Sequence, residues 1–443
     1  MESMGIGTLL AVLAVLASFS AYRHRREIWA RVDSPLTAAF IFMVPFVYTM
    51  PIFFSAFANS RSIEVNEYGL SSSASQYPAT ELQPYAEVTL TGFCALIVLS
   101  RFVRQTGPVQ VGKRGVLALI LGAVTLVGAL YASEPILSLA NVCFISVLVA
   151  TCFLSGGVSA VVGGAGYTVY VAVCSGVISL VNPEQVLVQC ERKCSAFGSV
   201  YYGLFLNENA LGLVLAIGIA LVWFSTKKST RYILSTLLVL SLLATGSRTA
   251  IFAGLISILL LALFVRDVEE GVRGARFLRI VVTACALLWP VSLLVTSIAS
   301  QLTGRPVLWD IALRYFAANP IFGWGAARWP TISHSGGFDA AARYSAHNQF
   351  YDVAFVGGII AVAIFYILFM GPMWSTDRQT SVASTVMLLP VALMGFTERP
   401  MAIGSLDWLS FTYLILLLIS PQMVGEKDRA RPRRSIGEYG AKR

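Results

Sequence analysis

Two arginines and a histidine stand at the starts of predicted helices in polar stretches of an otherwise apolar chain. Arg248 lies in TGSRTAIFAGL, Arg305 in TGRPVLWDIALRYFAANP and His347 in YSAHNQFYDVAF. A helix start that carries a guanidinium is a strong binding place for phosphate, and a neutral imidazole can act as a general base. The three residues therefore predict chemistry on a polyanionic group.

Local signals give the helix starts. Ser247 is a good N-cap for the apolar run that follows it, which places Arg248 in a first turn. Ser345 suits the same role before the next apolar run and would place His347 in a first turn as well. The positive end of a helix dipole disfavours imidazolium, so this position favours a neutral ring.

A short amphipathic helix is predicted over 306–318, with Arg305 at its N-terminus. Pro306 suits the first helical position, and Asn319-Pro320 ends the helix. We expect this helix to lie on the outer membrane surface, with one apolar face formed by Val307, Leu308, Ile311, Tyr315 and Phe316.

Plainer explanations exist for each of these residues. Either arginine could reach lipid phosphates or pair with a carboxylate such as Asp310 or Glu398. His347 could be a packed interfacial histidine.

Other polar residues near the outer boundary are weaker candidates. Asp352 lies one turn deeper than His347, and ionisable residues at the edge of an apolar zone are often functional. Asn209 in LNENALG, and Glu398 and Arg399 in FTERP, could orient a sugar or balance charge. The outer His, Asp and Glu residues lack metal-ligand spacing, and no nucleotide-binding motif is present, so we expect no metal and no cofactor.

The composition places these residues in a membrane protein. The 443-residue chain is 56% hydrophobic and 12% charged, against roughly 25% charged residues in soluble proteins. We expect an all-α polytopic membrane protein with about 12–13 transmembrane helices, since a span needs about 20 mostly apolar residues. The candidate spans lie near 5–21, 36–56, 85–103, 115–132, 136–154, 158–182, 208–225, 232–246, 249–265, 279–298, 351–371, 381–396 and 405–420.

The basic residues set the expected orientation. Of the 32 Lys and Arg residues, 23 fall in one set of alternate loops or in the C-terminal tail, and 9 fall in the other set. Cytoplasmic loops carry the excess of basic residues, so the tail is predicted to be cytoplasmic and the loop 299–350 to face outward. The net charge of +9 thus indicates topology, and no nucleic-acid partner is expected.

The chain divides into three predicted regions: an N-terminal transmembrane bundle over 1–206, a second transmembrane region over 207–420 that includes the outer loop, and a basic tail over 421–443. The outer loop 183–207 carries Cys190 and Cys194. These cysteines could form a disulfide in an oxidising compartment or remain free thiols, and the sequence leaves both alternatives open.

Three motifs in order resemble the O-antigen ligase and polysaccharide polymerase superfamily of bacterial envelopes. They are GSRTA opening a span, GR-x3-W followed by NPIFGWG, and HN followed by Gly358 at the start of an apolar run. The likeness covers roughly 207–408. Two departures are Ala361, where a second glycine is common, and a span count above the twelve usual for the ligases.

The resemblance implies a C-type membrane glycosyltransferase that needs no metal and inverts the anomeric carbon. The donor would be an undecaprenyl-diphosphate-linked glycan, bound at its diphosphate by Arg248 and Arg305. His347 would activate the acceptor hydroxyl, and Trp309 and Asn348 fall within the motifs as substrate-binding candidates. The enzyme would work in the bacterial inner membrane, with its active site facing the periplasm or exterior.

Three functions stay open at this stage. A polymerase would extend O-antigen or exopolysaccharide repeats, whereas a ligase would transfer the glycan to a lipid A core. We prefer the polymerase because no acceptor-docking module is evident, and a chain-length regulator and a flippase are then conceivable partners. A lipid-linked glycan transporter is the third alternative, but it would place charges in mid-span rather than at the outer boundary.

Overall fold

The computed structural model describes residues 2–29, 32, 34–57, 61–65, 71–75, 79–104, 113–133, 138–154, 156–189, 194–205, 207–226, 228–264, 275–294, 305–335, 345–375 and 378–419. The basic tail that the sequence predicts over 421–443 lies outside these residues, and the predicted three-region division remains a prediction.

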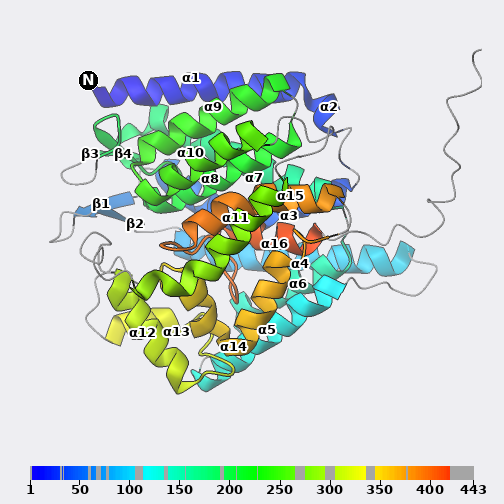
Figure 1. Ribbon diagram of the computed structural model, residues 1–443. Coiled ribbons are helices and arrows are strands. Elements are labelled where there is room, and N and C mark those ends of the chain that lie inside the picture. The colour runs from blue at the N-terminus through cyan, green and yellow to red at the C-terminus, as the bar shows by residue number, and fades with distance from the viewer. Residues whose placement is uncertain are drawn as a thin grey trace, which may run out of the picture.

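Helices dominate the N-terminal half, and every predicted span there coincides with one (Figure 1). These helices are α1 (Glu2–Arg23), α2 (Arg25–Trp29), α3 (Pro35–Phe57), α4 (Ala79–Arg104), α5 (Lys113–Tyr131), α6 (Leu139–Cys152) and α7 (Gly157–Val181). Between α3 and α4, β1 (Arg61–Val65) and β2 (Ser71–Ser75) form a small antiparallel hairpin.

The first helix is packed into the bundle and contacts α7 and α9. Ser179 Oγ donates a hydrogen bond to the carbonyl of Gly7 at 3.3 Å, and a Cβ on Gly7 would lie 2.9 Å from the Ser179 carbonyl oxygen. This close approach requires glycine, so α1 is an integral helix of the described fold.

The C-terminal half begins with a 3-10 turn and a second hairpin, and helices follow at each remaining predicted span. The elements are η1 (Pro183–Gln185), β3 (Leu187–Gln189), β4 (Ser199–Tyr201), α8 (Glu208–Ser225), α9 (Lys228–Thr245), α10 (Arg248–Phe264), α11 (Ala275–Leu288), η2 (Trp289–Leu294), α12 (Arg305–Ala318), α13 (Arg328–Ser335), α14 (Gln349–Met370), α15 (Arg378–Met394) and α16 (Ser410–Leu418). The helix α13 was not predicted.

Length and composition make six of the described helices suitable to cross a membrane, namely α3, α4, α5, α7, α8 and α14. Shorter apolar helices of 10–17 residues lie in α1, α6, α9, α10 and α15. The protein is therefore an all-α polytopic membrane protein, apart from two small hairpins, and the exact number of spans stays a prediction.

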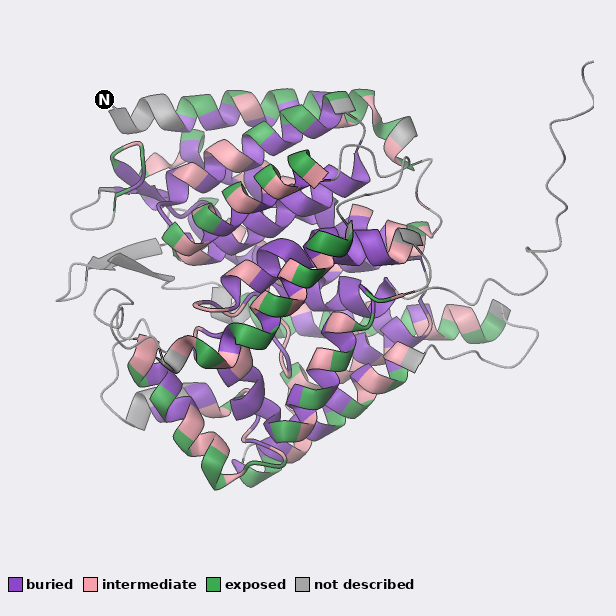
Figure 2. Cartoon of the chain, viewed as in Figure 1, coloured by how far each residue is buried: buried purple, intermediate pink, exposed green. Residues whose placement is uncertain are grey.

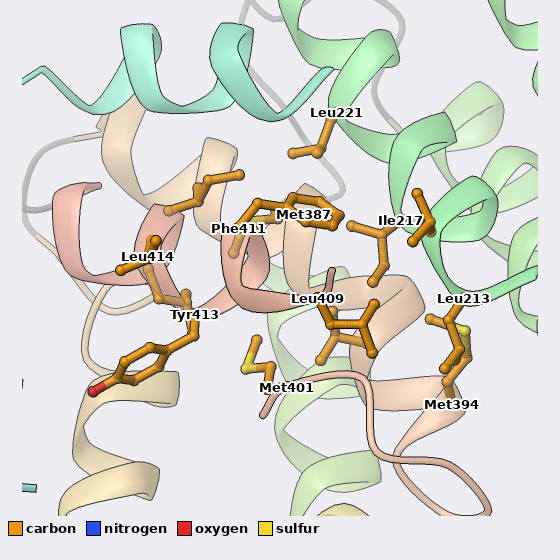
Figure 3. Close-up of a cluster of buried hydrophobic side chains, with 14 of the residues drawn as sticks. Leu213, Ile217, Leu221, Met387, Met394, Met401, Leu409, Phe411, Tyr413 and Leu414 are labelled. Atoms are coloured by element: carbon orange, nitrogen blue, oxygen red, sulfur yellow. The ribbon is translucent and has the colours of Figure 1, made fainter. Parts of the chain in front are cut away.

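Helix α8 forms the centre of the hydrophobic core. In the 18-residue apolar segment of α8, 89% of the residues are buried, against 22% in the corresponding segment of α4. Figure 2 shows α4 on the outside of the molecule. Leu213, Ile217 and Leu221 of α8 lie in one buried cluster with side chains of α15, α16 and the chain between them (Figure 3). Met394 and Met401, at the two ends of a loop described below, belong to this cluster and are fully buried.

Helix α14 is broken in its middle at two glycines. Gly357 (φ −136°, ψ 15°) and Gly358 (φ 64°, ψ −163°) are non-helical. A break inside a span leaves backbone groups without helical partners, and these must be satisfied by protein. The loop between α12 and α13 supplies the missing hydrogen-bond partners. Trp324 N–H donates to the Phe355 carbonyl, and Gly325 N–H donates to the Val356 carbonyl. In the other direction, Ile359 N–H donates to the Pro320 carbonyl.

The NPIFGWG motif is therefore a loop that inserts into the broken helix. Gly323 and Gly325 have positive φ values of 65° and 75°, and a Cβ on Gly323 would lie 2.5 Å from the Phe355 carbonyl oxygen. Trp324 Nε1 also donates to the Tyr315 carbonyl of α12 at 2.7 Å. This insertion joins α12, which begins at Arg305, to α14, which begins beside His347.

The apolar face of α12 differs partly from the prediction. Leu308, Trp309, Ile311 and Ala312 are buried, whereas Val307 is 52% exposed and faces away. The face of α12 that is buried lies about one residue further along the helix than the pattern indicated, because α12 packs against α14.

Candidate functional site

Arg305 and His347 share one carboxylate. His347 Nδ1 lies 3.0 Å from Glu398 Oε2, and Arg305 Nη2 donates to Glu398 Oε1. The Glu398 side chain is only 3% exposed, against 13% for Arg305 and 26% for His347. Glu398 thus bridges Arg305 and His347. This contact confirms the alternative in which Arg305 pairs with Glu398.

The other carboxylate considered for Arg305 has a different partner. Asp310 pairs with Arg314 one turn further along α12 at 2.6 Å, and both side chains are largely exposed. An exposed pair of this kind contributes little to stability.

His347 lies just before α14 and not in its first turn, which corrects the expectation that Ser345 caps this helix. The N-cap is Asn348, whose Oδ1 accepts from the backbone N–H groups of Phe350 and Tyr351. Ser345 Oγ instead accepts from the His347 N–H at 3.3 Å. His347 adopts φ +48°, a left-handed conformation that non-glycine residues rarely take. Such strain often accompanies functional residues.

The contact with Glu398 selects a tautomer of the neutral His347 ring. An ionised carboxylate can only accept a hydrogen bond, so the proton belongs on Nδ1 and Nε2 keeps a free lone pair. A ring held in this way can accept a proton at Nε2. The carboxylate also stabilises the charge that the ring would then carry.

Arg248 is the first residue of α10 and is exposed. Within the described part of the chain, it has no hydrogen-bond or ion-pair partner. Its turn is held on both sides: Ser247 Oγ donates to Asn209 Oδ1 at 2.9 Å, and the hydroxyls of Thr249 and Thr397 lie 3.0 Å apart. Because Thr397 precedes Glu398, the starts of α8 and α10 are tied to the carboxylate that joins Arg305 and His347.

Arg399 lies between two carboxylates. Its guanidinium is 3.2 Å from Asp407 and 3.8 Å from Asp352, which is fully buried in the first turn of α14. Arg399 is therefore compensated by its own carboxylates and is less available to an anionic ligand than Arg248.

Two of the predicted substrate-binding residues are engaged inside the protein. Asn348 is fully buried, and its Nδ2 donates to Phe396 O and Ser292 Oγ at 2.9 Å. Trp309 is 1% exposed and packs 6.0 Å from the ring of Tyr351. Substrate binding by Asn348, Trp309, Asn209 and Asp352 remains a prediction.

The structure adds residues that the sequence did not single out, namely Thr249, Gln349, Thr397 and Asp407. The sequence offered a signal for Asp407, because an acidic residue at the start of an apolar segment is often functional. The other three had none, because a neutral polar residue beside a helix end is common. Among the described residues, no group of three or more His, Cys, Asp or Glu side chains gathers as metal ligands do.

Together, the fold and this polar cluster define a polytopic membrane protein with a carboxylate-bound histidine just before one helix and, at the start of another, a guanidinium that no described residue pairs with. Residues 202–366 match the family model described as O-antigen ligase, and this match supports the O-antigen ligase and polymerase superfamily. No curated protein matches the chain.

The match includes Arg248, Arg305 and His347 but ends before Glu398. The matched family supports a membrane glycan enzyme of the O-antigen ligase or polymerase type, and the family implies a lipid-linked glycan donor and an acceptor as substrates.

Proposed function

We propose that the protein transfers a glycan from undecaprenyl diphosphate to an acceptor hydroxyl, and that it polymerises O-antigen or exopolysaccharide repeats. The observation that carries this proposal is the Arg305–Glu398–His347 contact, together with Arg248, which has no partner among the described residues and whose neighbour Thr249 contacts Thr397. It combines a proton acceptor with cations suited to a diphosphate leaving group.

In this reaction the acceptor oxygen attacks the anomeric carbon while its proton moves to Nε2 of His347. The bond between the anomeric carbon and the phosphate oxygen breaks, and the electron pair stays on undecaprenyl diphosphate. Attack opposite the leaving group inverts the anomeric carbon. A general base of this kind contributes about 10²–10⁴-fold to the rate.

The developing negative charge would be stabilised by Arg248 and by the N–H donors of Arg305 that do not face Glu398. Glu398 would hold the imidazole in place and balance its positive charge after proton transfer. Because two guanidiniums provide this stabilisation, we propose that the reaction needs no metal ion.

A disulfide supports the proposal that this site faces away from the cytoplasm. Cys194 is disulfide-bonded, while its expected partner Cys190 lies outside the described residues. The Cys194 end of the hairpin packs on the turn before Arg248: a Cβ on Gly246 would lie 3.2 Å from Ser195 N and 3.4 Å from the Cys194 carbonyl carbon. Disulfides persist in oxidising compartments, so this face is expected to be periplasmic.

Basic residues at the opposite helix ends support the same orientation. Arg231 Nη2 donates to the Thr226 carbonyl at the end of α8, and Arg114 Nη1 donates to the Leu416 carbonyl near the end of α16. Cations at helix C-termini are favourable, and basic residues gather on the cytoplasmic side. The C-terminus would then be cytoplasmic.

The second candidate is transfer to a lipid A core, which the description of the matched family favours. The two functions differ only in the acceptor. The deciding experiment incubates the purified protein with lipid-linked repeats, with and without lipid A core, and analyses the products on a gel. Longer lipid-linked chains without core support polymerisation, whereas transfer only when core is present supports ligation. Wild-type protein that makes neither product would contradict the proposed function.

A further inference from the structure

The loop 395–401 between α15 and α16 is closed at both ends by Gln349. The backbone N–H of Gln349 donates to the Gly395 carbonyl at 2.9 Å. Its side-chain Nε2 donates to the Met401 carbonyl at 3.0 Å, and its Oε1 accepts from the Met401 N–H at 2.9 Å. One residue thus binds the first and the last residue of the loop, and Glu398 is at its middle.

The remaining residues of this loop are also anchored. Asn348 binds the Phe396 carbonyl, Thr249 binds Thr397, and Thr412 Oγ1 donates to the Pro400 carbonyl at 3.0 Å. Arg399 pairs with Asp352 and Asp407. Glu398 therefore extends from a backbone with little freedom, and among the described residues Gln349 makes the most hydrogen bonds to that backbone.

Gln349 is also placed to align His347 with Glu398. It follows His347 by two residues, so the histidine and the residue that closes the loop are on the same short backbone segment. The Gln349 side chain is fully buried, and Met401 next to it is fixed in the hydrophobic cluster of Figure 3. A buried amide whose donor and acceptor are both satisfied holds its partners rigidly.

We propose that Gln349 is a positioning residue, which fixes the loop 395–401 so that Glu398 meets Nδ1 of His347. The proposal rests on the proposed glycan transfer. A displacement of about 1 Å at reacting groups can cost roughly 10²-fold in rate. The effect of Gln349 should therefore fall on kcat and should require an intact Glu398.

The test is a double-mutant cycle with full-length purified protein and a lipid-linked repeat as donor. The variants are Gln349→Met, which keeps the size but lacks both hydrogen bonds, Glu398→Asp, which keeps a carboxylate at a shorter reach, and the double variant. We expect Gln349→Met to lower kcat about 10–10²-fold with the donor KM little changed, and to have almost no further effect when combined with Glu398→Asp.

Gln349→Asn keeps the amide at shorter reach and carries the test if Gln349→Met does not insert. The matched control is Asn182→Leu, which removes an amide that donates to the Phe57 carbonyl at 2.7 Å, away from the site. This control should leave kcat unchanged. Membrane level and thermal unfolding are measured for every variant.

Two results would overturn the positioning role: unchanged kcat in Gln349→Met and Gln349→Asn, or losses that multiply fully in the double variant. Failure of the proposed function gives a different pattern, in which the wild type transfers no glycan or His347→Ala is fully active. The two failures are therefore distinguishable.

Discussion

His347 and Glu398 are separated by 51 residues in the chain, yet His347 Nδ1 and Glu398 Oε2 lie 3.0 Å apart. The carboxylate also binds Arg305, 93 residues away in sequence. A single buried side chain thus links the start of α12 to His347, two residues before α14.

Replacement of His347 tests the general base. His347→Ala should lower the rate of glycan transfer by about 10²–10⁴-fold, because the acceptor hydroxyl would lose its proposed general base. The rate is measured with a lipid-linked repeat, and the amount of protein in the membrane should stay normal. Wild-type activity in this variant would exclude His347 as the base.

Removal of the negative charge at position 398 tests the role of the carboxylate. Glu398→Gln retains the shape but no longer balances a protonated His347, so we expect a loss of kcat of roughly 10²-fold. The donor KM should change less than kcat. An unchanged kcat would show that the His347–Glu398 contact is structural only.

The two arginines should differ in their effect on stability. Arg305→Ala leaves Glu398 buried without its guanidinium partner, and breaking a buried pair costs about 3–5 kcal/mol. Arg248→Ala removes an exposed residue with no partner within the described residues, so its effect should be within about 0.5 kcal/mol. Both variants should lose transfer activity.

Thermal unfolding in detergent, together with the transfer assay, separates these effects. Equal destabilisation by Arg248→Ala and Arg305→Ala would contradict the different pairing of the two arginines.

The disulfide at Cys194 provides a topology test. A membrane-impermeant maleimide should label Cys194 in intact spheroplasts only after reduction. Cys94 is buried inside the bundle and is the matched residue that should stay unlabelled under both conditions. Labelling of Cys194 from the cytoplasmic side alone would reverse the proposed orientation.

The break in α14 predicts that alanine substitution affects stability very differently at Gly358 and at Gly92. Gly358 has φ +64°, and a Cβ there would collide with the Ile321 carbonyl oxygen. Gly358→Ala should therefore destabilise the protein by at least about 1–3 kcal/mol, the cost of the backbone strain alone. Gly92→Ala in α4 is the control, because no atom lies within 4 Å of its added Cβ. The control should be neutral or stabilising by up to about 1 kcal/mol.

The stability of the Gly358→Ala and Gly92→Ala variants is measured by thermal unfolding. A neutral Gly358→Ala would show that α14 can form a continuous helix and that the inserted loop 320–325 is not required.

Local patterns in the sequence correctly predict a helix at every candidate span, the short helix α12, and two of the three helix-start residues, but not α13. Ser247 before an apolar run, and Pro306 after Arg305, are signals that depend on neighbouring residues alone. The low charge and the ordered motifs likewise predict a polytopic membrane protein of the family that the comparison supports. These features need no knowledge of long-range contacts.

Only the tertiary structure assigns Glu398 to the centre of the site, Asn348 to the N-cap of α14 and Gln349 to the closure of the loop 395–401. Choices between equally good local partners, such as Ser345 or Asn348 for a cap and Asp310 or Glu398 for Arg305, depend on which groups packing brings within hydrogen-bonding distance. A loop of seven residues has no periodicity from which its path can be predicted, because its hydrogen-bond partners come from distant helices.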